Sequence, residues 1–101
     1  MQSMLIVTVM FTVDPAHAET FREAVLTQAQ NSLYREAGCR QFDVAVAADD
    51  PCTIFLYEVY SDAAAFARHL ESTHFKQFDD IVTPWVETKE VRTFNKLGPG
   101  V

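Results

Sequence analysis

The chain has 101 residues, of which 49% are hydrophobic and 22% charged, and its formal net charge is −6. These proportions exclude a disordered chain and predict a single globular domain over residues 1–101, with its core between about residues 4 and 97. Because eight Lys and Arg residues are scattered among fourteen acidic ones, neither a nucleic acid nor a membrane surface is expected as a partner.

Residues 4–13 alternate between apolar side chains on one face and a mixture of apolar side chains and threonine on the other, which predicts the first strand. The run is too short for a membrane span and has no basic flank, so we expect no signal peptide and a cytoplasmic protein. Asp14 and Pro15 favour the start of a helix, which we expect over residues 15–36 with Gly38 as its stop. Its predicted buried residues recur at helical spacing: Phe21, Val25, Ala29 and Leu33.

Residues 40–47 alternate again and predict the second strand, which the Asp49-Asp50-Pro51 cluster ends. Residues 53–60 are almost continuously apolar or β-branched, and this composition predicts a third strand in the middle of the sheet. Cys39 and Cys52 then lie at opposite ends of the hairpin formed by these strands. They are too far apart for a disulfide, so we expect two free thiols.

Ser61 is expected to cap a second helical segment, and Thr73 to begin a third helix that ends at Pro84. Residues 87–97 then predict a fourth strand, and residues 98–100 a tail. The element order, β-α-β-β-α-β, is that of a split βαβ unit. We therefore expect an α+β, ferredoxin-like fold with a four-stranded antiparallel sheet and helices on one face.

The first and third strands are apolar on both faces, although the helices can cover only one face of the sheet. An exposed second face would form a larger apolar surface than a soluble monomer usually carries. We therefore expect a homodimer that packs sheet against sheet.

His69 and His74 lie five residues apart at the break between the second and third helices, close in sequence to several aromatic residues. A histidine at the rim of an apolar pocket suits general acid or base catalysis near neutral pH. A surface position or a helix cap would explain each histidine as simply. The hypothesis taken forward is that both are catalytic.

Tyr57 and Glu58 are neighbours in the third strand and therefore point to opposite faces of the sheet, so only one of them can face the helices. Glu58 is either a partly desolvated carboxylate of the site or the partner of an arginine at the dimer contact. Tyr57 is either part of the core or a proton donor in the cavity. Both are kept as catalytic candidates.

Five further residues are candidates for contact with a small-molecule substrate: Phe11, Asn31, Phe66, Phe78 and Trp85. Asn31 and Gln28, three residues apart on the long helix, could direct their amides toward the sheet, although a solvated helix face would explain them as well. Trp85 could simply close the core. The sequence contains no glycine-rich phosphate loop and no paired-cysteine motif. It therefore predicts neither a nucleotide cofactor nor a metal.

Four groups of residues, taken in chain order, carry a family likeness. They are Gly38-Cys39-Arg40-Gln41-Phe42-Asp43-Val44, then Asp50-Pro51, then Phe55-Leu56-Tyr57-Glu58-Val59-Tyr60, then His69 with Ser72, His74 and Phe75. These segments resemble the antibiotic biosynthesis monooxygenase (ABM) domain family over almost the entire chain, from Met4 to about Leu97. A late Phe94-Asn95 pair adds to the likeness to one subgroup. Within that family they are most similar to the subgroup that contains the isomerase of the phosphorylated signal autoinducer-2.

The resemblance implies a ferredoxin-like subunit that pairs into a dimeric α+β barrel. It also implies a cofactor-independent monooxygenase, without metal or flavin, that acts on a small quinol, polyketide or hydroxyketone compound. One alternative is an isomerase of a phosphorylated, autoinducer-2-like hydroxydione, with Arg35, Arg68 or Lys76 as phosphate contacts. The other is a non-catalytic ligand-binding or stress-response dimer. Haem-degrading relatives carry an iron-binding histidine where this chain has Asp79 and Asp80, so haem degradation is not expected.

Overall fold

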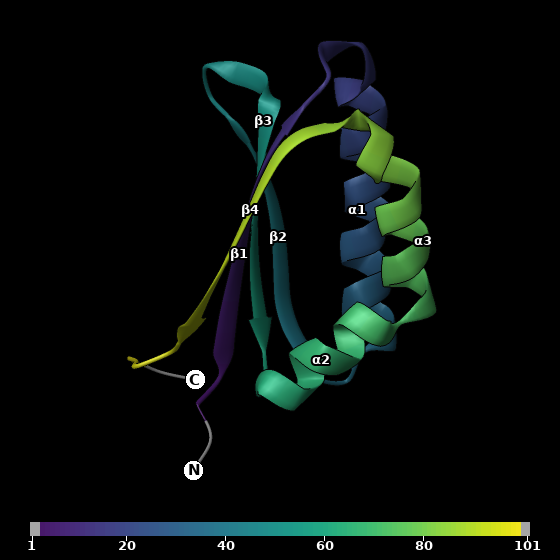
Figure 1. The fold of residues 1–101 in the computed structure, drawn as a ribbon. Coiled ribbons are helices and arrows are strands. Elements are labelled where there is room, and N and C mark those ends of the chain that lie inside the picture. Colours follow the sequence, from purple (N-terminus) through teal and green to yellow (C-terminus); the bar gives the residue numbers. More distant parts are fainter. Residues whose placement is uncertain (1–2, 100–101) are drawn as a thin grey trace.

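A computed structural model describes residues 3–99 of the chain (Figure 1). Its elements are β1 (Leu5–Val13), the 3₁₀ turn η1 (Pro15–His17), α1 (Ala18–Arg35), β2 (Cys39–Ala47), β3 (Asp50–Tyr60), α2 (Ala63–Glu71), α3 (Thr73–Val82), the 3₁₀ turn η2 (Thr83–Trp85) and β4 (Val86–Asn95). Every predicted strand and helix is present, in the predicted order. The largest differences are of three residues: β3 begins at Asp50 instead of residue 53, and α1 begins at Ala18 instead of residue 15, after the turn η1. Gly100, part of the predicted tail, lies outside the described residues.

The four strands form one antiparallel sheet in the order β2-β3-β1-β4. The three α-helices lie together on one face of this sheet, as Figure 1 shows. This arrangement confirms the predicted α+β, ferredoxin-like fold and the central position of β3. Within residues 3–99, no helix is both long and apolar enough to cross a membrane.

The strand register decides which side chains face the helices. Phe42, Glu58 and Val7 lie side by side on β2, β3 and β1, and residues directly opposite each other on neighbouring strands point to the same face. All three are buried, so theirs is the face that the helices cover. Tyr57, the neighbour of Glu58, therefore points to the uncovered face.

Helix α1 buries three of its four predicted residues, Phe21, Val25 and Ala29, but not the fourth. The Asp14 carboxylate accepts a hydrogen bond of 3.1 Å from the Ala16 N–H and caps the turn η1, which leads into the helix. The prediction for Leu33 is wrong, because Leu33 is 46% exposed whereas Ser32 is fully buried. With about 3.6 residues per turn, each step of four residues rotates a side chain further from the core, and Leu33 stands three such steps beyond Phe21.

The cap of α2 is one residue later than expected. Asp62, and not Ser61, caps this helix, and its carboxylate accepts a hydrogen bond of 2.8 Å from the Ala65 N–H. The Ser61 N–H instead donates to the Gly38 carbonyl oxygen at 2.8 Å. Ser61 therefore joins the end of β3 to the start of β2.

Gly38 follows α1 as predicted, but for another reason than a left-handed helix end. Within residues 3–99, the only positive φ is at Gly98. A Cβ on Gly38 would lie 2.5 Å from the Ala65 Cβ, so the absence of a side chain lets the chain approach α2 closely. This contact helps to place the end of α1, at Glu36, beside α2.

The sheet face without helices exposes apolar side chains. Met10 is 43% and Phe94 39% exposed. Phe55, which lies opposite Met10, and Tyr57 are half-buried on the same face. The apolar character that β1 and β3 were expected to show on both faces is therefore present.

Both cysteines are free thiols, as predicted. Cys39 lies opposite Tyr60 at one end of the β2-β3 hairpin, and Cys52 lies at the other end. Burial raises the pKa of the Cys39 thiol to about 12. This thiol therefore stays protonated near neutral pH and is a poor nucleophile.

Candidate active site

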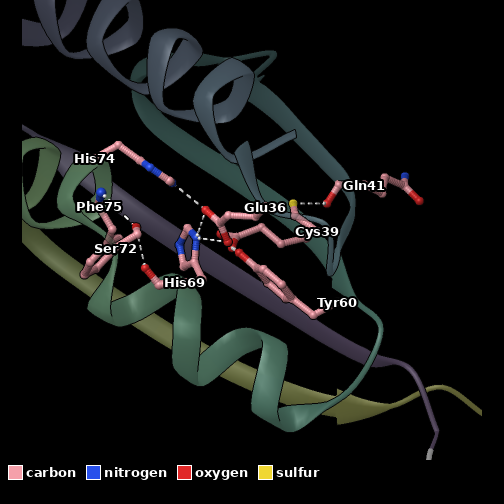
Figure 2. A network of polar contacts seen from close by, with 9 residues as sticks. Glu36, Cys39, Gln41, Tyr60, His69, Ser72, His74 and Phe75 are labelled. Carbon is pink, nitrogen blue, oxygen red and sulfur yellow. Dashed lines mark hydrogen bonds and ion pairs between the residues drawn. The ribbon is translucent and has the colours of Figure 1, made fainter. Parts of the chain in front are cut away.

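Three side chains from three helix ends meet at one carboxylate. Glu36 caps the C-terminus of α1, His69 lies in the last turn of α2, and His74 lies in the first turn of α3. The Oε2 atom of Glu36 is 2.9 Å from His69 Nδ1 and 2.5 Å from His74 Nε2. Figure 2 shows both imidazole rings directed at this carboxylate. The two predicted histidines are therefore joined by a third residue that was not predicted.

Ser72 stabilises the turn between α2 and α3, and each of these helices carries one of the two histidines. Its hydroxyl donates to the His69 carbonyl oxygen at 2.7 Å and accepts from the Phe75 N–H at 3.2 Å (Figure 2). It thus follows the last turn of α2 and caps α3. Because the chain turns at Ser72, His69 and His74 reach the same carboxylate from two directions.

The shared carboxylate fixes which imidazole nitrogens carry protons. A carboxylate only accepts hydrogen bonds, so His69 Nδ1 and His74 Nε2 each donate an N–H to Glu36. His69 is 3% exposed, and this burial lowers its pKa although the hydrogen bond to Glu36 acts in the opposite direction. Near neutral pH, His69 is therefore an uncharged imidazole whose basic atom is Nε2.

His69 also lines a cavity of about 60 Å³ between the helices and the covered face of the sheet. Five phenylalanines form much of its wall: Phe11, Phe42, Phe66, Phe75 and Phe78. Aliphatic side chains complete the apolar part: Val7, Val9, Leu56, Leu70 and Val91. Among the described residues, the polar lining side chains are Gln28, Glu58, His69 and Lys89. Apolar walls with a few polar groups are typical of a site for a small organic molecule.

Glu58 is the buried acid of this cavity. Burial raises its pKa from 4.5 to about 7, while a hydrogen bond of 2.6 Å from the Tyr60 hydroxyl to Oε1 opposes that rise. The same burial and the neighbouring carboxylate raise the pKa of Tyr60, so its hydroxyl stays protonated. Near neutral pH, Glu58 can therefore donate a proton while His69 can accept one.

The cavity opens toward β4. Leu70 and Val91, which line it, are 41% and 47% exposed. Lys89 lies at this opening, with its ammonium 5.7 Å from the centroid of the Phe11 ring and 3.8 Å from the Asp79 carboxylate. A substrate that enters here would pass the Lys89 ammonium group, which is already paired with the Asp79 carboxylate.

A second hollow, of about 220 Å³, lies between α1 and α3 and is called here the outer groove. It is lined by Ala24, Thr27, Gln28, Asn31, His74, Gln77, Phe78 and Ile81. His69 borders the cavity and His74 borders the outer groove, and Glu36 is hydrogen-bonded to both. The carboxylate therefore connects the two hollows.

The structure brings most of the predicted site residues to these hollows. The cavity receives His69, Glu58, Phe11, Phe66 and Phe78, and the outer groove receives His74 and Asn31. Tyr57 lies on the opposite face of the sheet, because the register turns Glu58 toward the helices. Trp85 stacks on His17, with ring centroids 5.1 Å apart, near the start of α1. The cavity is not lined by any of the three cationic residues that were considered as contacts for a substrate phosphate, which are Arg35, Arg68 and Lys76.

Glu36 and Lys89 belong to the site but were not among its predicted residues, and Gln28 was considered only beside Asn31, as an amide that could point toward the sheet. Gln28, Ser32 and Glu36 recur at every fourth position along one side of α1, and the first two are 3% and 0% exposed. Polar residues on the stripe that should be apolar are the signal that could have identified them.

Glu36, His69 and His74 could also hold a metal ion, since one ligand atom from each lies within 4.8 Å of the others. Two imidazoles and one carboxylate are a ligand set used by zinc and by iron. The same atoms already satisfy one another by direct hydrogen bonds, so the three groups are also complete as an acid-base network. That no metal is required stays a prediction.

Residues 4–80 match the family model described as antibiotic biosynthesis monooxygenase. No curated protein matches the sequence. A solved structure from Nitrosomonas europaea, provisionally named an antibiotic biosynthesis monooxygenase, is 31% identical with a TM-score of 0.91, covering 98% of this chain and 95% of that one. A protein from Pseudomonas aeruginosa is 26% identical with a TM-score of 0.88, covering 97% and 98%. A similarly named protein from Caulobacter crescentus is 20% identical, with a TM-score of 0.90, and the match covers 96% of this chain and 92% of that one. At this identity the similarity concerns the fold alone.

We predict that Glu58→Gln stabilises the protein at pH 8 but not at pH 5. Because the folded state holds the Glu58 proton more tightly than the unfolded chain does, wild-type stability falls as pH rises from 4.5 to about 7. Glutamine cannot ionise, and its carbonyl oxygen can still accept the hydrogen bond from Tyr60. Urea unfolding should show the variant gaining about 2–3 kcal/mol over wild type between pH 5 and pH 8.

Glu23→Gln, at an exposed position of α1, is the matched control and should have the same small effect at both pH values. A stability difference between Glu58→Gln and wild type that does not change with pH would contradict the raised pKa.

Proposed function

Since the chain belongs to the antibiotic biosynthesis monooxygenase family, we propose that it is an enzyme that removes a proton from a small organic substrate in the cavity lined by His69. The proposed reaction is the cofactor-independent monooxygenation of a small quinol, polyketide or hydroxyketone compound. The observation that carries the proposal is the hydrogen bond of 2.9 Å from His69 Nδ1 to Glu36 at the wall of a largely aromatic cavity.

His69 is the proposed base. Its Nε2 takes a proton from a substrate O–H, or from a C–H next to a carbonyl, and the ring becomes an imidazolium. The Nδ1–H bond to Glu36 holds the ring in place, and the negative carboxylate stabilises the positive charge that develops on it. A base positioned in this way contributes about 10²–10⁴-fold to a rate.

Glu58 is the proposed acid. Its pKa of about 7 leaves a large fraction protonated near neutral pH, so it can donate to the substrate oxygen on which negative charge develops. The apolar walls exclude water, and the effective dielectric constant in such a cavity is lower than in solvent. The hydrogen bond to the substrate oxygen is therefore stronger than it would be in water.

The substrate anion then reacts with dioxygen, which the proposal takes as the second substrate. Electrons pass from the anion to O₂, a carbon–oxygen bond forms, and loss of water leaves a carbonyl. For a quinol with an unsubstituted ring C–H, the balance is quinol and O₂ giving hydroxyquinone and H₂O. For a ring CH₂ next to a carbonyl, CH₂ and O₂ give C=O and H₂O. The substrate itself supplies the electrons, so this reaction needs no other reductant.

His74 is proposed as a positioning residue. From the side of the outer groove, its Nε2–H donates to the same Glu36 oxygen that His69 contacts. This second hydrogen bond restricts the carboxylate to the orientation that serves His69. His74 therefore acts on the reaction through Glu36.

The isomerase and the non-catalytic ligand-binding dimer stay predictions. An isomerase of a phosphorylated hydroxydione would use the same base but return the proton to a neighbouring carbon without consuming oxygen. The cationic side chain that lines the cavity and could contact such a phosphate is Lys89, which is already paired with Asp79. A non-catalytic dimer would bind ligands in the cavity without proton transfer.

We predict that His69→Gln slows enzyme-dependent oxygen uptake from a panel of benzoquinols and naphthoquinols by about 10²–10⁴-fold. Glu36→Gln keeps the base but removes the charge that stabilises it, and should slow uptake by at least about tenfold. Rates are measured in an oxygen electrode after subtraction of quinol autoxidation. His17→Gln is the matched control, because His17 lies at the start of α1, stacked on Trp85, and should leave the rate unchanged.

A full rate in His69→Gln would rule out His69 as the base. If no quinol consumes oxygen but NMR shows solvent deuterium entering a hydroxyketone, proton abstraction stands and oxygenation is wrong. If neither occurs, the non-catalytic function is favoured.

We also propose that the functional unit is a homodimer in which the uncovered sheet faces pack together. Met10, Phe55, Tyr57 and Phe94 lie on that face, and burying them between two copies removes apolar surface from water. A symmetric dimer needs only one self-complementary patch. The family likeness to a dimeric barrel supports the same arrangement.

We predict a mass of twice the 11.4 kDa chain mass when the protein is analysed by size exclusion with light scattering at micromolar concentration. Met10→Lys, which places a charge on the uncovered face, should shift the protein toward the monomer. Leu33→Lys is the matched control, because Leu33 is 46% exposed, as against 43% for Met10, but lies on α1. A monomeric wild type, or equal dissociation by the two variants, would contradict the proposed interface.

A further inference from the structure

Gln28 is a buried polar side chain to which the proposed reaction gives no role. It lies on α1, is 3% exposed, and lines both the outer groove and the cavity that holds His69 and Glu58. Within residues 3–99, neither its Nε2 nor its Oε1 has a hydrogen-bond partner. Because an unpaired polar group in an apolar environment is unfavourable, the partner of this amide should come from outside the chain.

The amide defines the chemistry of that partner. A side-chain amide presents a donor and an acceptor on neighbouring atoms. A molecule that satisfies both at once carries an acceptor beside a donor, as a carbonyl and a hydroxyl on neighbouring carbons do. An isolated ketone would leave Oε1 unpaired. A carboxylate would leave it unpaired too, and would add a negative charge beside Glu58.

A lactam also offers an acceptor beside a donor. Its carbonyl, however, acidifies neighbouring C–H bonds much less than a ketone does, and the reaction proposed for His69 depends on that acidity. The hydroxy-carbonyl pair is therefore the chemistry that fits both the amide and the base.

The cavity walls define the rest of the molecule. Five of the lining side chains are phenylalanines, which pack well against a planar ring. The volume of about 60 Å³ has room for a few water molecules or part of a one-ring compound. Water can therefore occupy the cavity in the free protein, and a bound ring would extend toward the opening at Leu70 and Val91.

We propose that Gln28 recognises a hydroxyl group next to a carbonyl on a compound with a planar ring, and so selects α-hydroxyketones and hydroxyquinones over the same compounds without the hydroxyl. This inference rests on the proposed function, because it takes the cavity of His69 as the substrate site. It narrows the proposed quinol, polyketide and hydroxyketone substrates to those that carry a hydroxyl group next to a carbonyl.

Calorimetric titration with 2-hydroxyacetophenone and with acetophenone tests the proposal. Wild type should bind the hydroxyketone about tenfold more tightly than the ketone, since the ketone leaves half of the amide unpaired. Gln28→Met keeps the length of the side chain and removes the amide, so it should bind the two compounds with similar Kd. Asn31→Met is the matched control: Asn31 is an amide on the same helix that lines the outer groove instead of the cavity, and the variant should keep the wild-type preference.

Urea unfolding of the ligand-free variants gives a second readout. Because the Gln28 amide has no partner within the described chain, Gln28→Met should be at least as stable as wild type. A variant that is clearly less stable, or that fails to fold, would show that the amide serves the fold, and would overturn the proposal.

The failure of this proposal can be told apart from failure of the proposed reaction. If Gln28→Met loses the preference but wild type shows neither oxygen uptake nor deuterium exchange, the reaction is wrong and the recognition by Gln28 stands. If wild type binds neither probe, binds both equally, or keeps its preference in Gln28→Met, the recognition by Gln28 is wrong whatever the activity.

Discussion

The arrangement of the site depends on one carboxylate shared by two imidazoles. Glu36 accepts hydrogen bonds from both His69 and His74 at Oε2, and His69 Nδ1 also lies 3.1 Å from Oε1. Each contact joins elements that are distant in sequence. The contact can form only if the end of α1 lies against α2, which the close approach of Gly38 to Ala65 permits. It also requires the chain to turn between the two histidines. The helix break and the glycine are therefore parts of the site as much as of the fold.

The second constraint is the presence of polar groups in a small apolar core. Burial acts in opposite directions on the two ionisable groups of the cavity: it lowers the pKa of His69 and raises that of Glu58. A neutral base and a partly protonated acid can then coexist near neutral pH. Gln28 adds an amide with no partner in the described chain. These groups cost stability that an apolar core would not, and the binding and proton-transfer roles proposed for them would account for their presence.

The sequence was sufficient for the fold because its signals are local. Alternation along the strands and the cap at Asp14 depend on residues a few positions apart. It was insufficient for the site because Glu36 lies 33 residues from His69, and no local pattern links them. The choice between Tyr57 and Glu58 depended on the strand register, which adjacent sequence leaves open when both faces are apolar.

The most direct test of the shared carboxylate is the protonation of individual imidazole nitrogens, observed by ¹⁵N NMR of the histidine rings at neutral pH. The account predicts that His69 carries its proton on Nδ1 and His74 on Nε2, and that Glu36→Gln changes the signals of both rings. His17, at the other end of α1, should be unaffected and serves as an internal reference. A His69 ring protonated on Nε2, with both signals unchanged in Glu36→Gln, would contradict the account.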